Sequence, residues 1–257
     1  ILLFIVEEAV RAGIEDIVIV AGRGKTAIED FFDTSYELED KLAKDGKEVW
    51  LNEVRRIKSL ANIISIRQLE AGGLGHAVLA SRPIVGDDPF AVLLGDELTF
   101  AKDGDPTVTG KLVSCYNETG ISTVAVMEVE PQEVKKYGIV AYSSEDNGLF
   151  KVTSVIEKPS PEKAPSRLAL PGRYVFSSAI YGHLQNVKPG VIGEIQLTDG
   201  MTLLAENQGL YATKFSARRY DAGDKFGYLQ ANIELGLEHP EVGDRLRTYI
   251  KNLANRL

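Results

Sequence analysis

The chain has 257 residues, of which 44% are hydrophobic, and it carries a formal net charge of −8 at pH 7. This length and composition suit a soluble protein with one large α/β domain and a sizeable core. The acidic side chains are scattered and no basic face is present, which argues against a nucleic-acid partner. Cys115 is the only cysteine, so an intrachain disulfide and a cysteine metal cluster are excluded, and a reducing, cytoplasmic location is expected.

Apolar positions at the start of the chain predict a helix. Leu2, Val6, Ala9 and Val10 fall on one helical face, and Gly13 is placed to end the helix. This apolar opening is too short to span a bilayer and lacks the basic flank of a signal peptide. We therefore expect no membrane partner.

A strand and a glycine-rich turn are predicted next, at 14–20 and 21–26. The triplet Gly24-Lys25-Thr26 is similar to the end of a P-loop. That motif requires a glycine five positions before Gly24, where Ile19 stands. We therefore interpret 21–26 as a turn from strand to helix and not as a phosphate loop.

The remaining pattern alternates helices and strands, and no repeat or linker divides it. One or two amphipathic surface helices are expected between 32 and 60, and further helices near 77–81, 110–118, 178–184, after 194–199, and at 226–236 and 242–253. Strands are expected at 62–67, 90–96, 122–127, 134–141, 151–157, 168–176 and 210–215.

The apolar run that ends at Asp96 is the most informative stretch. Phe90–Leu94 has no polar break, which predicts a strand buried on both faces, as in a parallel sheet flanked by helices. A carboxylate at the carboxyl end of such a strand points into the crevice where open α/β sheets bind ligands. The alternative is that Asp96 only caps the next turn, since glycine and aspartate are common in turns.

Two other places carry candidate binding groups. The glycine-rich stretch 70–77 follows Gln68 and leads into a helix, so its backbone amides can approach a ligand closely beside the positive helix end. Lys158 precedes Pro159, and proline favours an extended backbone at the residue before it, which suits a fixed charge. Taken alone, these features also fit a plain turn and a solvated lysine.

Seven short motifs occur in one order along nearly the whole chain, and together they resemble the sugar nucleotidylyltransferase family. They are Gln68 with Gly73–Ala77, Leu94–Asp96, Lys136–Gly138, Glu157–Pro159, Gly172–Tyr174, Glu194–Asp199 and Asp221–Gly223. Within that family, the stretch 32–39 and the helical insert after it resemble the bacterial branch that uses UTP and glucose 1-phosphate.

The resemblance implies a single nucleotidyltransferase domain over residues 1–257, with a Rossmann-like, three-layer α/β fold around a mixed, mostly parallel central sheet. It implies transfer of a uridylyl group from UTP to glucose 1-phosphate with release of pyrophosphate. Because the attacking phosphate oxygen is already ionised, such a reaction depends on positioning and charge neutralisation and needs no protein nucleophile.

The same resemblance implies a role for each matched residue. Gln68 and Gly73 would bind the nucleotide base, Gly138, Glu157 and Gly172 would bind the sugar, Lys158 would hold the sugar phosphate, and Asp96 and Asp221 would share a Mg²⁺ ion that bridges substrate phosphates. Lys158 and Asp96 are the expected catalytic residues. A lysine and a hard cation with carboxylate ligands are the groups that a reaction between two anions requires.

The front of the chain departs from the family pattern. A glycine-rich Gly-x-Gly-Thr-Arg loop and its strand, which the family places before the first helix seen here, do not occur in the sequence. We therefore expect the domain to lack its N-terminal strand and glycine-rich loop. Smaller departures are Ala222, where a cysteine is common, and Gly200, where an alanine is usual.

Two alternatives stay open on the sequence. The chain could use a thymidine nucleotide or another hexose phosphate, because uracil and thymine differ by one methyl group. It could also be a non-catalytic nucleotide-sugar-binding relative, although binding alone does not require both Asp96 and Asp221. We expect a homo-oligomer, with the C-terminal helices at 226–257 as a candidate contact.

Overall fold

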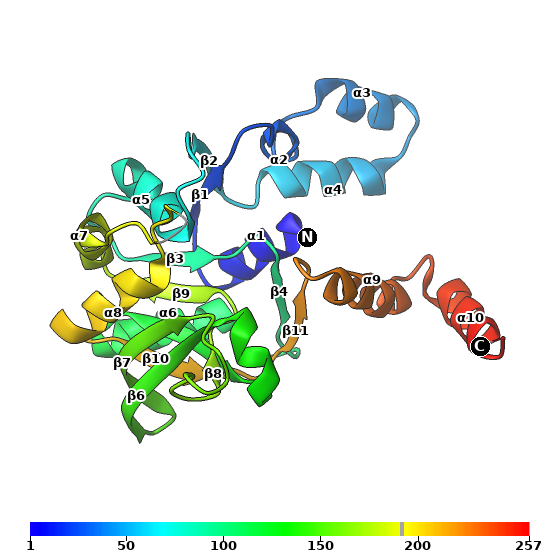
Figure 1. Ribbon diagram of the computed structural model, residues 1–257. Helices are drawn as coiled ribbons and strands as arrows, with labels where there is room; N and C mark the ends of the chain where they lie inside the picture. Colours follow the sequence, from blue (N-terminus) through cyan, green and yellow to red (C-terminus); the bar gives the residue numbers. More distant parts are fainter. Residues whose placement is uncertain (191–192, 257) are drawn as a thin grey trace.

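A computed structural model describes residues 1–190 and 193–256 and has an α/β architecture (Figure 1). The helices are α1 (Leu2–Arg11), α2 (Thr26–Asp30), α3 (Tyr36–Lys44), α4 (Glu48–Lys58), α5 (Leu74–Val85), α6 (Val108–Thr119), the 3-10 helix η1 (Pro131–Lys136), α7 (Ala179–Asn186), α8 (Leu197–Asn207), α9 (Lys225–Glu238) and α10 (Gly243–Ala254). The strands are β1 (Asp16–Ala21), β2 (Asn62–Arg67), β3 (Phe90–Leu93), β4 (Glu97–Phe100), β5 (Thr123–Glu128), β6 (Gly138–Asp146), β7 (Leu149–Glu157), β8 (Leu168–Ala169), β9 (Arg173–Phe176), β10 (Tyr211–Lys214) and β11 (Arg218–Asp221).

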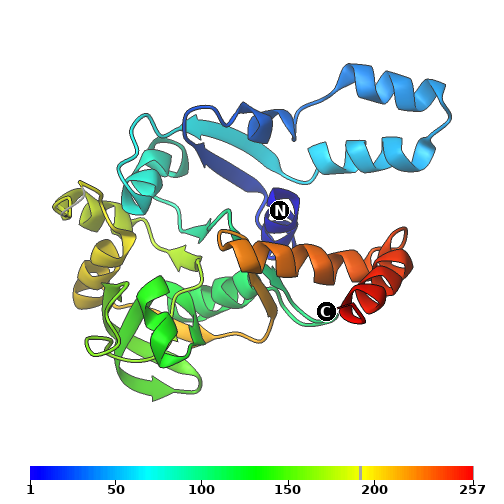
Figure 2. The same cartoon turned by 45° about the vertical axis from the view of Figure 1, so that its right-hand side comes forward.

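Most predicted elements are confirmed, including the two surface helices between 32 and 60. Figures 1 and 2 both show α3 and α4 extending away from the body, with α9 and α10 forming a second projection. Leu257, the last residue of the predicted C-terminal segment, lies outside the described residues. Within the described chain, no helix is long and apolar enough to cross a membrane.

The strands form three sheets. β1 pairs in parallel with β2, β4 pairs antiparallel with β11, and seven strands form the main sheet in the order β10-β7-β6-β8-β5-β9-β3. An additional parallel pairing of β10 with β5 closes five of these strands into a ring. The main sheet is therefore mixed, as expected, and contains a small closed barrel that the sequence did not indicate.

The prediction that the sheet is mostly parallel is wrong for the described strands. Parallel pairing occurs in the ladders β1–β2 and β5–β10, and the other ladders are antiparallel. The link between β6 and β7 gives the physical reason. Asn147 and Gly148 both have positive φ, at 50° and 80°, which is the conformation of a two-residue hairpin turn. Such a turn can join only antiparallel strands, because a parallel pair needs a crossover of a dozen or more residues.

Helices cover both faces of the main sheet, which confirms the three-layer part of the prediction. Along β5, Val124 and Val126 belong to the core shared with α5, α7 and α8, while Ala125 belongs to the core shared with α6. Side chains alternate between the two faces of a strand, so each face of β5 contacts a different helical layer. The larger core lies on the α7 and α8 side, where Leu184 and Met201 are fully buried.

The strand before Asp96 differs from its prediction. Phe90–Leu93 form β3, but each of these residues is only half-buried, and β3 lies at the end of the strand order. It pairs antiparallel with β9. An apolar run is therefore not sufficient to predict a strand buried on both faces, because half-burial also favours apolar side chains.

A buried ion pair joins α1 to this part of the sheet. Glu8 is 1% exposed and Arg173 is 0% exposed, and the Arg173 Nη2 atom lies 2.9 Å from Glu8 Oε2. Thr99 and Thr109 also donate hydrogen bonds to the Glu8 carboxylate. Burial opposes ionisation of Glu8, but the hydrogen bonds and charge of Arg173, with those of Thr109 and Thr99, more than offset it and hold the pKa of Glu8 below its ordinary value.

Replacing Glu8 with alanine should destabilise the fold by about 3–5 kcal/mol, because the substitution leaves the charge of Arg173 buried without its partner. Urea unfolding followed by circular dichroism measures this loss. The adjacent Glu7 provides a matched control, since it pairs with Arg56 at the surface, where side-chain exposures are 28% and 44%. We expect Glu7→Ala to cost at most about 1 kcal/mol. Equal losses for the two variants would contradict the structural role of Glu8.

Candidate active site

Asp96 and Asp221 meet at one end of the β4–β11 ribbon. Asp221 is the last residue of β11 and lies opposite Glu97, the first residue of β4. The Ala222 N–H donates to the Asp96 carbonyl over 2.7 Å, which holds the two chain segments together just beyond the ladder. The structure therefore brings together two residues that are 125 positions apart in the sequence and were both predicted to hold a metal.

The space between these two carboxylates is kept open by Gly223. A Cβ atom at position 223 would lie 2.6 Å from Asp96 Oδ2 and 3.3 Å from Asp221 Oδ1. Both oxygens thus face the same small volume, which fits an oxygen-preferring cation such as Mg²⁺. Among the described residues, no group of three or more His, Cys, Asp or Glu side chains could hold a metal. A cation here would need substrate oxygens to complete its coordination, which is how Mg²⁺ is commonly held.

Glu97 lies behind this pair and is only 3% exposed. Arg219 donates to both Glu97 carboxylate oxygens, with Nε–Oε1 at 2.5 Å and Nη2–Oε2 at 2.8 Å. Burial raises the pKa of Glu97 to about 7, although the hydrogen bonds and charge of Arg219 oppose the rise. The same Arg219 Nη2 atom lies 3.6 Å from Asp221 Oδ2, so one guanidinium contacts two of the acidic groups.

Arg173 holds the turn that carries Asp96. Besides its ion pair, Arg173 donates to the backbone carbonyls of Leu94, Gly172 and Glu97, at 3.4, 3.2 and 2.7 Å. Leu94 N–H also donates to the Gly172 carbonyl over 3.0 Å. Gly172 has φ 114°, and a Cβ there would meet Leu94 Cγ at 2.7 Å. The positive φ and the close approach of Leu94 both require glycine at position 172. Gly172, which was predicted to bind the sugar, therefore lies against the turn that carries Asp96.

Gly138, Glu157 and Lys158 form a second corner. Gly138 begins β6 and pairs with Glu157 at the end of β7. A Cβ at position 138 would lie 3.3 Å from Glu157 Oε2 and 2.9 Å from the Thr198 methyl group. Lys158 is exposed, and its Nζ atom lies 3.7 Å from Glu157 Oε1. The three predicted residues are therefore adjacent in space.

The predicted extended backbone at Lys158 is wrong. Lys158 has φ 45°, in the left-handed region that side-chain-bearing residues rarely adopt. The Lys158 N–H donates to the Tyr137 carbonyl over 3.0 Å, and this tertiary bond overrides the preference set by Pro159. Backbone strain of this kind concentrates at functional sites.

Gln68 and Gly73 lie together in the glycine-rich turn before α5. The Gln68 side-chain amide contacts the Gly73 carbonyl at 3.1 Å and His76 Nδ1 at 2.9 Å. Gly73 is the N-cap of α5 with φ 90°, and a Cβ there would meet Glu194 Cβ at 2.8 Å and the Ile195 carbonyl at 2.9 Å. The prediction that this glycine-rich stretch leads into a helix is confirmed, and the helix begins at Leu74.

Three connections unite the predicted residues. The segment 194–198 packs against Gly73 at one end and against Gly138 at the other. Tyr137 precedes Gly138, and its hydroxyl oxygen lies 3.0 Å from Arg219 Nη1, which links this corner to Asp221. Gly172 contacts Leu94 near Asp96. The residues expected from the sequence to contact the nucleotide, the sugar and the metal therefore lie in one continuous region.

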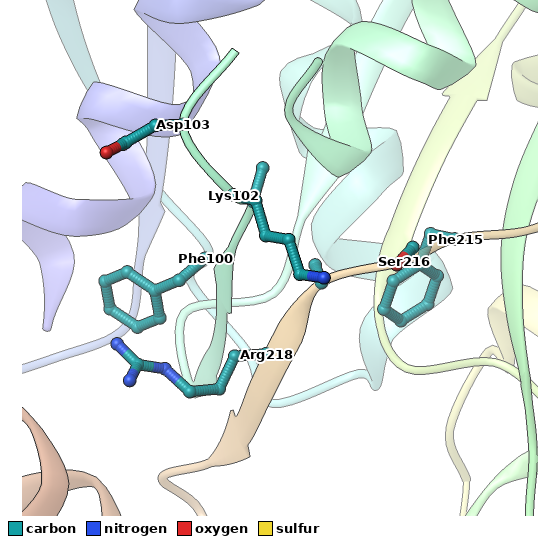
Figure 3. Close-up of a pocket in the computed structure, with 8 residues that line it drawn as sticks. Phe100, Lys102, Asp103, Phe215, Ser216 and Arg218 are labelled. Atoms are coloured by element: carbon teal, nitrogen blue, oxygen red, sulfur yellow. The ribbon is translucent and has the colours of Figure 1, made fainter. Parts of the chain in front are cut away.

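A separate groove lies at the far end of the β4–β11 ribbon. It has a volume of about 750 Å³ and is lined by Phe100, Ala101, Lys102, Asp103, Phe215, Ser216, Ala217 and Arg218. Figure 3 shows the Lys102 amine directed toward Phe215 and Ser216, with Asp103 directed away. Phe100 pairs with Arg218 three residues along the ladder from Glu97, roughly 10 Å away at 3.3 Å per residue. None of the predicted site residues lines this groove, so its size does not make it the candidate active site.

The sequence analysis gave no role to the residues that hold the site in place: Glu8, Glu97, Tyr137, Arg173 and Arg219. Glu8 gave no signal of burial, because at about 100° per residue it lies roughly 100° around the first helix from Ala9 and about 160° from Val6, away from the apolar face predicted there. Tyr137 and Arg173 lie in two of the quoted motifs, but their supporting contacts, like those of Glu97 and Arg219, join segments that are distant in the sequence.

Comparisons with known proteins identify the family of the chain. The profile of the nucleotidyl transferase family matches residues 1–236. A UTP–glucose-1-phosphate uridylyltransferase of Bacillus subtilis is 43% identical over 253 residues, covering 98% of this chain and 84% of that protein. A UTP-bound UDP-glucose pyrophosphorylase from Acinetobacter baumannii superposes with a TM-score of 0.88 at 38% identity, covering 98% of this chain and 87% of that one.

A crystal structure of UDP-glucose pyrophosphorylase complexed with UDP-glucose gives a TM-score of 0.84 at 37% identity, covering 92% of this chain and 86% of that chain. The likeness thus holds in sequence and in structure over nearly the full length of the chain. The chain belongs to the nucleotidyl transferase family, and within it to the UTP–glucose-1-phosphate uridylyltransferases.

Proposed function

We propose that the protein transfers the uridylyl group of UTP to glucose 1-phosphate, giving UDP-glucose and pyrophosphate. The observation that carries the proposal is the pair Asp96 and Asp221 facing one small volume at Gly223, connected through Arg219 and Tyr137 to Lys158. Relatives of closely similar sequence and fold are named for this reaction, and structures of two of them were solved with UTP and with UDP-glucose.

In this reaction a phosphate oxygen of glucose 1-phosphate attacks the α-phosphorus of UTP. One phosphorus–oxygen bond forms and the bond to pyrophosphate breaks, so no proton has to leave the nucleophile at neutral pH. The main barrier is repulsion between anions, which positioned cations lower. Asp96 and Asp221 would hold Mg²⁺, which supplies positive charge to the substrate phosphates when bound.

Lys158 provides the second cation. Its side chain is exposed and its backbone is fixed in a strained conformation by Tyr137, so the amine can reach the phosphate of glucose 1-phosphate from a defined point. Glu157 lies beside it and offers acceptor oxygens to sugar hydroxyls. Thr198 supports a polar ligand here, because its buried hydroxyl has no hydrogen-bond partner among the described residues and its methyl group lies near Gly138.

The turn around Gln68 and Gly73 is suited to the nucleotide. The Gln68 amide carries a donor and an acceptor, the pair that the edge of a uracil ring requires, and a base would take the place of a contact that its Nε2 atom now makes with Gly73 or His76. Gly73 brings its backbone close to the ligand at the N-terminus of α5, where the helix dipole favours an anion. Gly172, which adjoins the Asp96 turn, would complete the sugar contact.

Two alternatives can be separated from this proposal by a substrate panel. A thymidylyltransferase, or an enzyme for another hexose phosphate, would form product faster from dTTP or from that sugar phosphate. A non-catalytic binding protein would bind UDP-glucose but release no pyrophosphate with any pair. We expect UTP with glucose 1-phosphate to give the highest kcat/KM, with a modest margin of about 10- to 200-fold over dTTP, because one methyl group is worth only about 1–3 kcal/mol.

The cytoplasmic location and the homo-oligomer remain predictions. The C-terminal helices support the prediction of a homo-oligomer, because α9 exposes three large apolar side chains. The exposed fractions of Phe226, Leu229 and Ile233 are 73%, 57% and 44%. Large apolar side chains at the surface of a projecting helix are typical of contact surfaces.

Replacing either metal carboxylate by its amide should lower kcat by at least about 100-fold, since even groups behind a metal ligand are typically worth 10- to 100-fold. Asp96→Asn and Asp221→Asn test this, with the activity measured against Mg²⁺ concentration and the melting temperature measured alongside. Gly223→Ala is a third variant that leaves both carboxylates in place but puts a methyl group between them, and it should raise the Mg²⁺ concentration for half-maximal activity. Near-normal activity in all three would remove this corner from the active site.

Lys158→Ala and Gln68→Ala should impair different substrates. The lysine supplies charge to a sugar phosphate, while the glutamine pairs with a base edge. We expect Lys158→Ala to raise KM for glucose 1-phosphate and Gln68→Ala to raise KM for UTP, each by roughly tenfold for the loss of a charged or paired hydrogen bond. Measuring KM for each substrate separately tests this. The assignment is wrong if both variants raise KM for the same substrate, or if Lys158→Ala raises KM for UTP and Gln68→Ala raises KM for glucose 1-phosphate.

A further inference from the structure

Arg219 connects the two corners of the site, and the proposed function does not assign it a role. It lies on β11 two residues before Asp221, and residues two apart on a strand project from the same face. Its guanidinium uses Nε and Nη2 to contact the Glu97 carboxylate at 2.5 and 2.8 Å, and Nη2 also lies 3.6 Å from Asp221 Oδ2. The Arg219 side chain is 18% exposed.

The remaining nitrogen of Arg219 faces the lysine corner. Arg219 Nη1 donates to the Tyr137 hydroxyl over 3.0 Å, and the guanidinium carbon lies 5.3 Å from the centre of the Tyr137 ring. The Tyr137 carbonyl in turn accepts from the Lys158 N–H at 3.0 Å. A continuous series of contacts therefore runs from Asp221 through Arg219 and Tyr137 to the strained backbone of Lys158.

We infer that Arg219 is a positioning residue that fixes the separation and orientation of Asp221 relative to Lys158, through Tyr137. The inference rests on the proposed function, in which these two side chains hold opposite ends of the reacting phosphates. Their relative position decides whether the attacking oxygen lies in line with the leaving group, and reactions of this type lose rate steeply when positioning is lost.

The geometry at Asp221 supports this role. Asp221 Oδ1 accepts from the backbone N–H groups of Gly223 and Asp224, both at 3.1 Å, while Oδ2 faces Arg219. The carboxylate is thus held from both sides. The short contacts of Arg219 go to Glu97 and its contact with Asp221 is longer, so Arg219 orients Asp221 without forming a close ion pair with it. Asp221 therefore stays available to a cation.

Only arginine fits this position. Its planar fork reaches Glu97 with two nitrogens and Tyr137 with the third, and it packs on the tyrosine ring. A lysine would retain the positive charge but could not make these contacts together. Arg219→Lys therefore separates positioning from charge, and Tyr137→Phe removes only the hydroxyl that accepts from Arg219.

The adjacent Arg218 provides a matched control. It belongs to the same strand but pairs with Glu238 and packs on Phe100, away from the proposed site. Arg218→Lys should lower the melting temperature at least as much as Tyr137→Phe does. It should leave the binding of UTP and UDP-glucose, and kcat/KM for glucose 1-phosphate, unchanged.

The test measures binding as well as rate. Calorimetric titration of UDP-glucose and of UTP in metal-free buffer is compared for the wild type, Tyr137→Phe, Arg219→Lys and Arg218→Lys, together with steady-state constants in Mg²⁺. We expect Tyr137→Phe and Arg219→Lys to weaken UDP-glucose binding and to lower kcat/KM for glucose 1-phosphate, by about 10- to 100-fold for Arg219→Lys. UTP binding should stay within about twofold, because the nucleotide turn makes no contact with this series in the described residues.

Tyr137→Phe decides the outcome, since it is the variant least able to disturb the fold. A loss of threefold or more that is confined to UDP-glucose and glucose 1-phosphate supports the inference. A smaller loss, or an equal loss for UTP, overturns it and leaves Arg219 as a support for the β4–β11 ribbon. If the wild type forms no UDP-glucose, the proposed function fails instead, and the two failures are therefore distinguishable.

Discussion

The buried ion pair between Glu8 and Arg173 is the constraint on which the site depends. Two charges in a nearly dry interior are tolerated only when they are paired and fully hydrogen-bonded, and Arg173 meets that requirement by also donating to the carbonyls of Leu94, Gly172 and Glu97. Those bonds tie the first helix, the turn before β4 and the start of β9 into one unit. The position of the Asp96 turn is thereby set by the side chains of Glu8 and Arg173, which are buried.

The charge distribution explains how an acidic protein can bind two polyanions. With a net charge of −8, the chain has no long-range attraction for phosphates, so positive charge has to be supplied locally. Lys158, the amino end of α5 and a cation between Asp96 and Asp221 would each do so from a different element. Arg219 directs its short contacts to Glu97, and the contribution inferred for it is geometric.

The sequence predicted the helices and strands better than it predicted which strands pair with one another. The strand at 62–67 and the two helices between 32 and 60 follow from hydrophobic periodicity, and the eight site residues follow from a family resemblance that needs only their order. Antiparallel pairing was missed because the hairpin at Asn147–Gly148 was not recognised as a turn signal. The left-handed backbone of Lys158 was missed because a tertiary bond to Tyr137 overrides the effect of Pro159. The supporting arginines depend on contacts between distant strands, which no local pattern encodes.

A crystal structure of the protein with UDP-glucose and Mg²⁺ tests the central claim most directly, because it locates the metal, the sugar phosphate and the base in one measurement. The account predicts a metal ion bound by Asp96 and Asp221 at about 2.0–2.1 Å, the sugar phosphate at Lys158 and the uracil at Gln68. A nucleotide sugar bound in the groove between Phe100 and Phe215, or a metal ion that contacts neither aspartate, would contradict it.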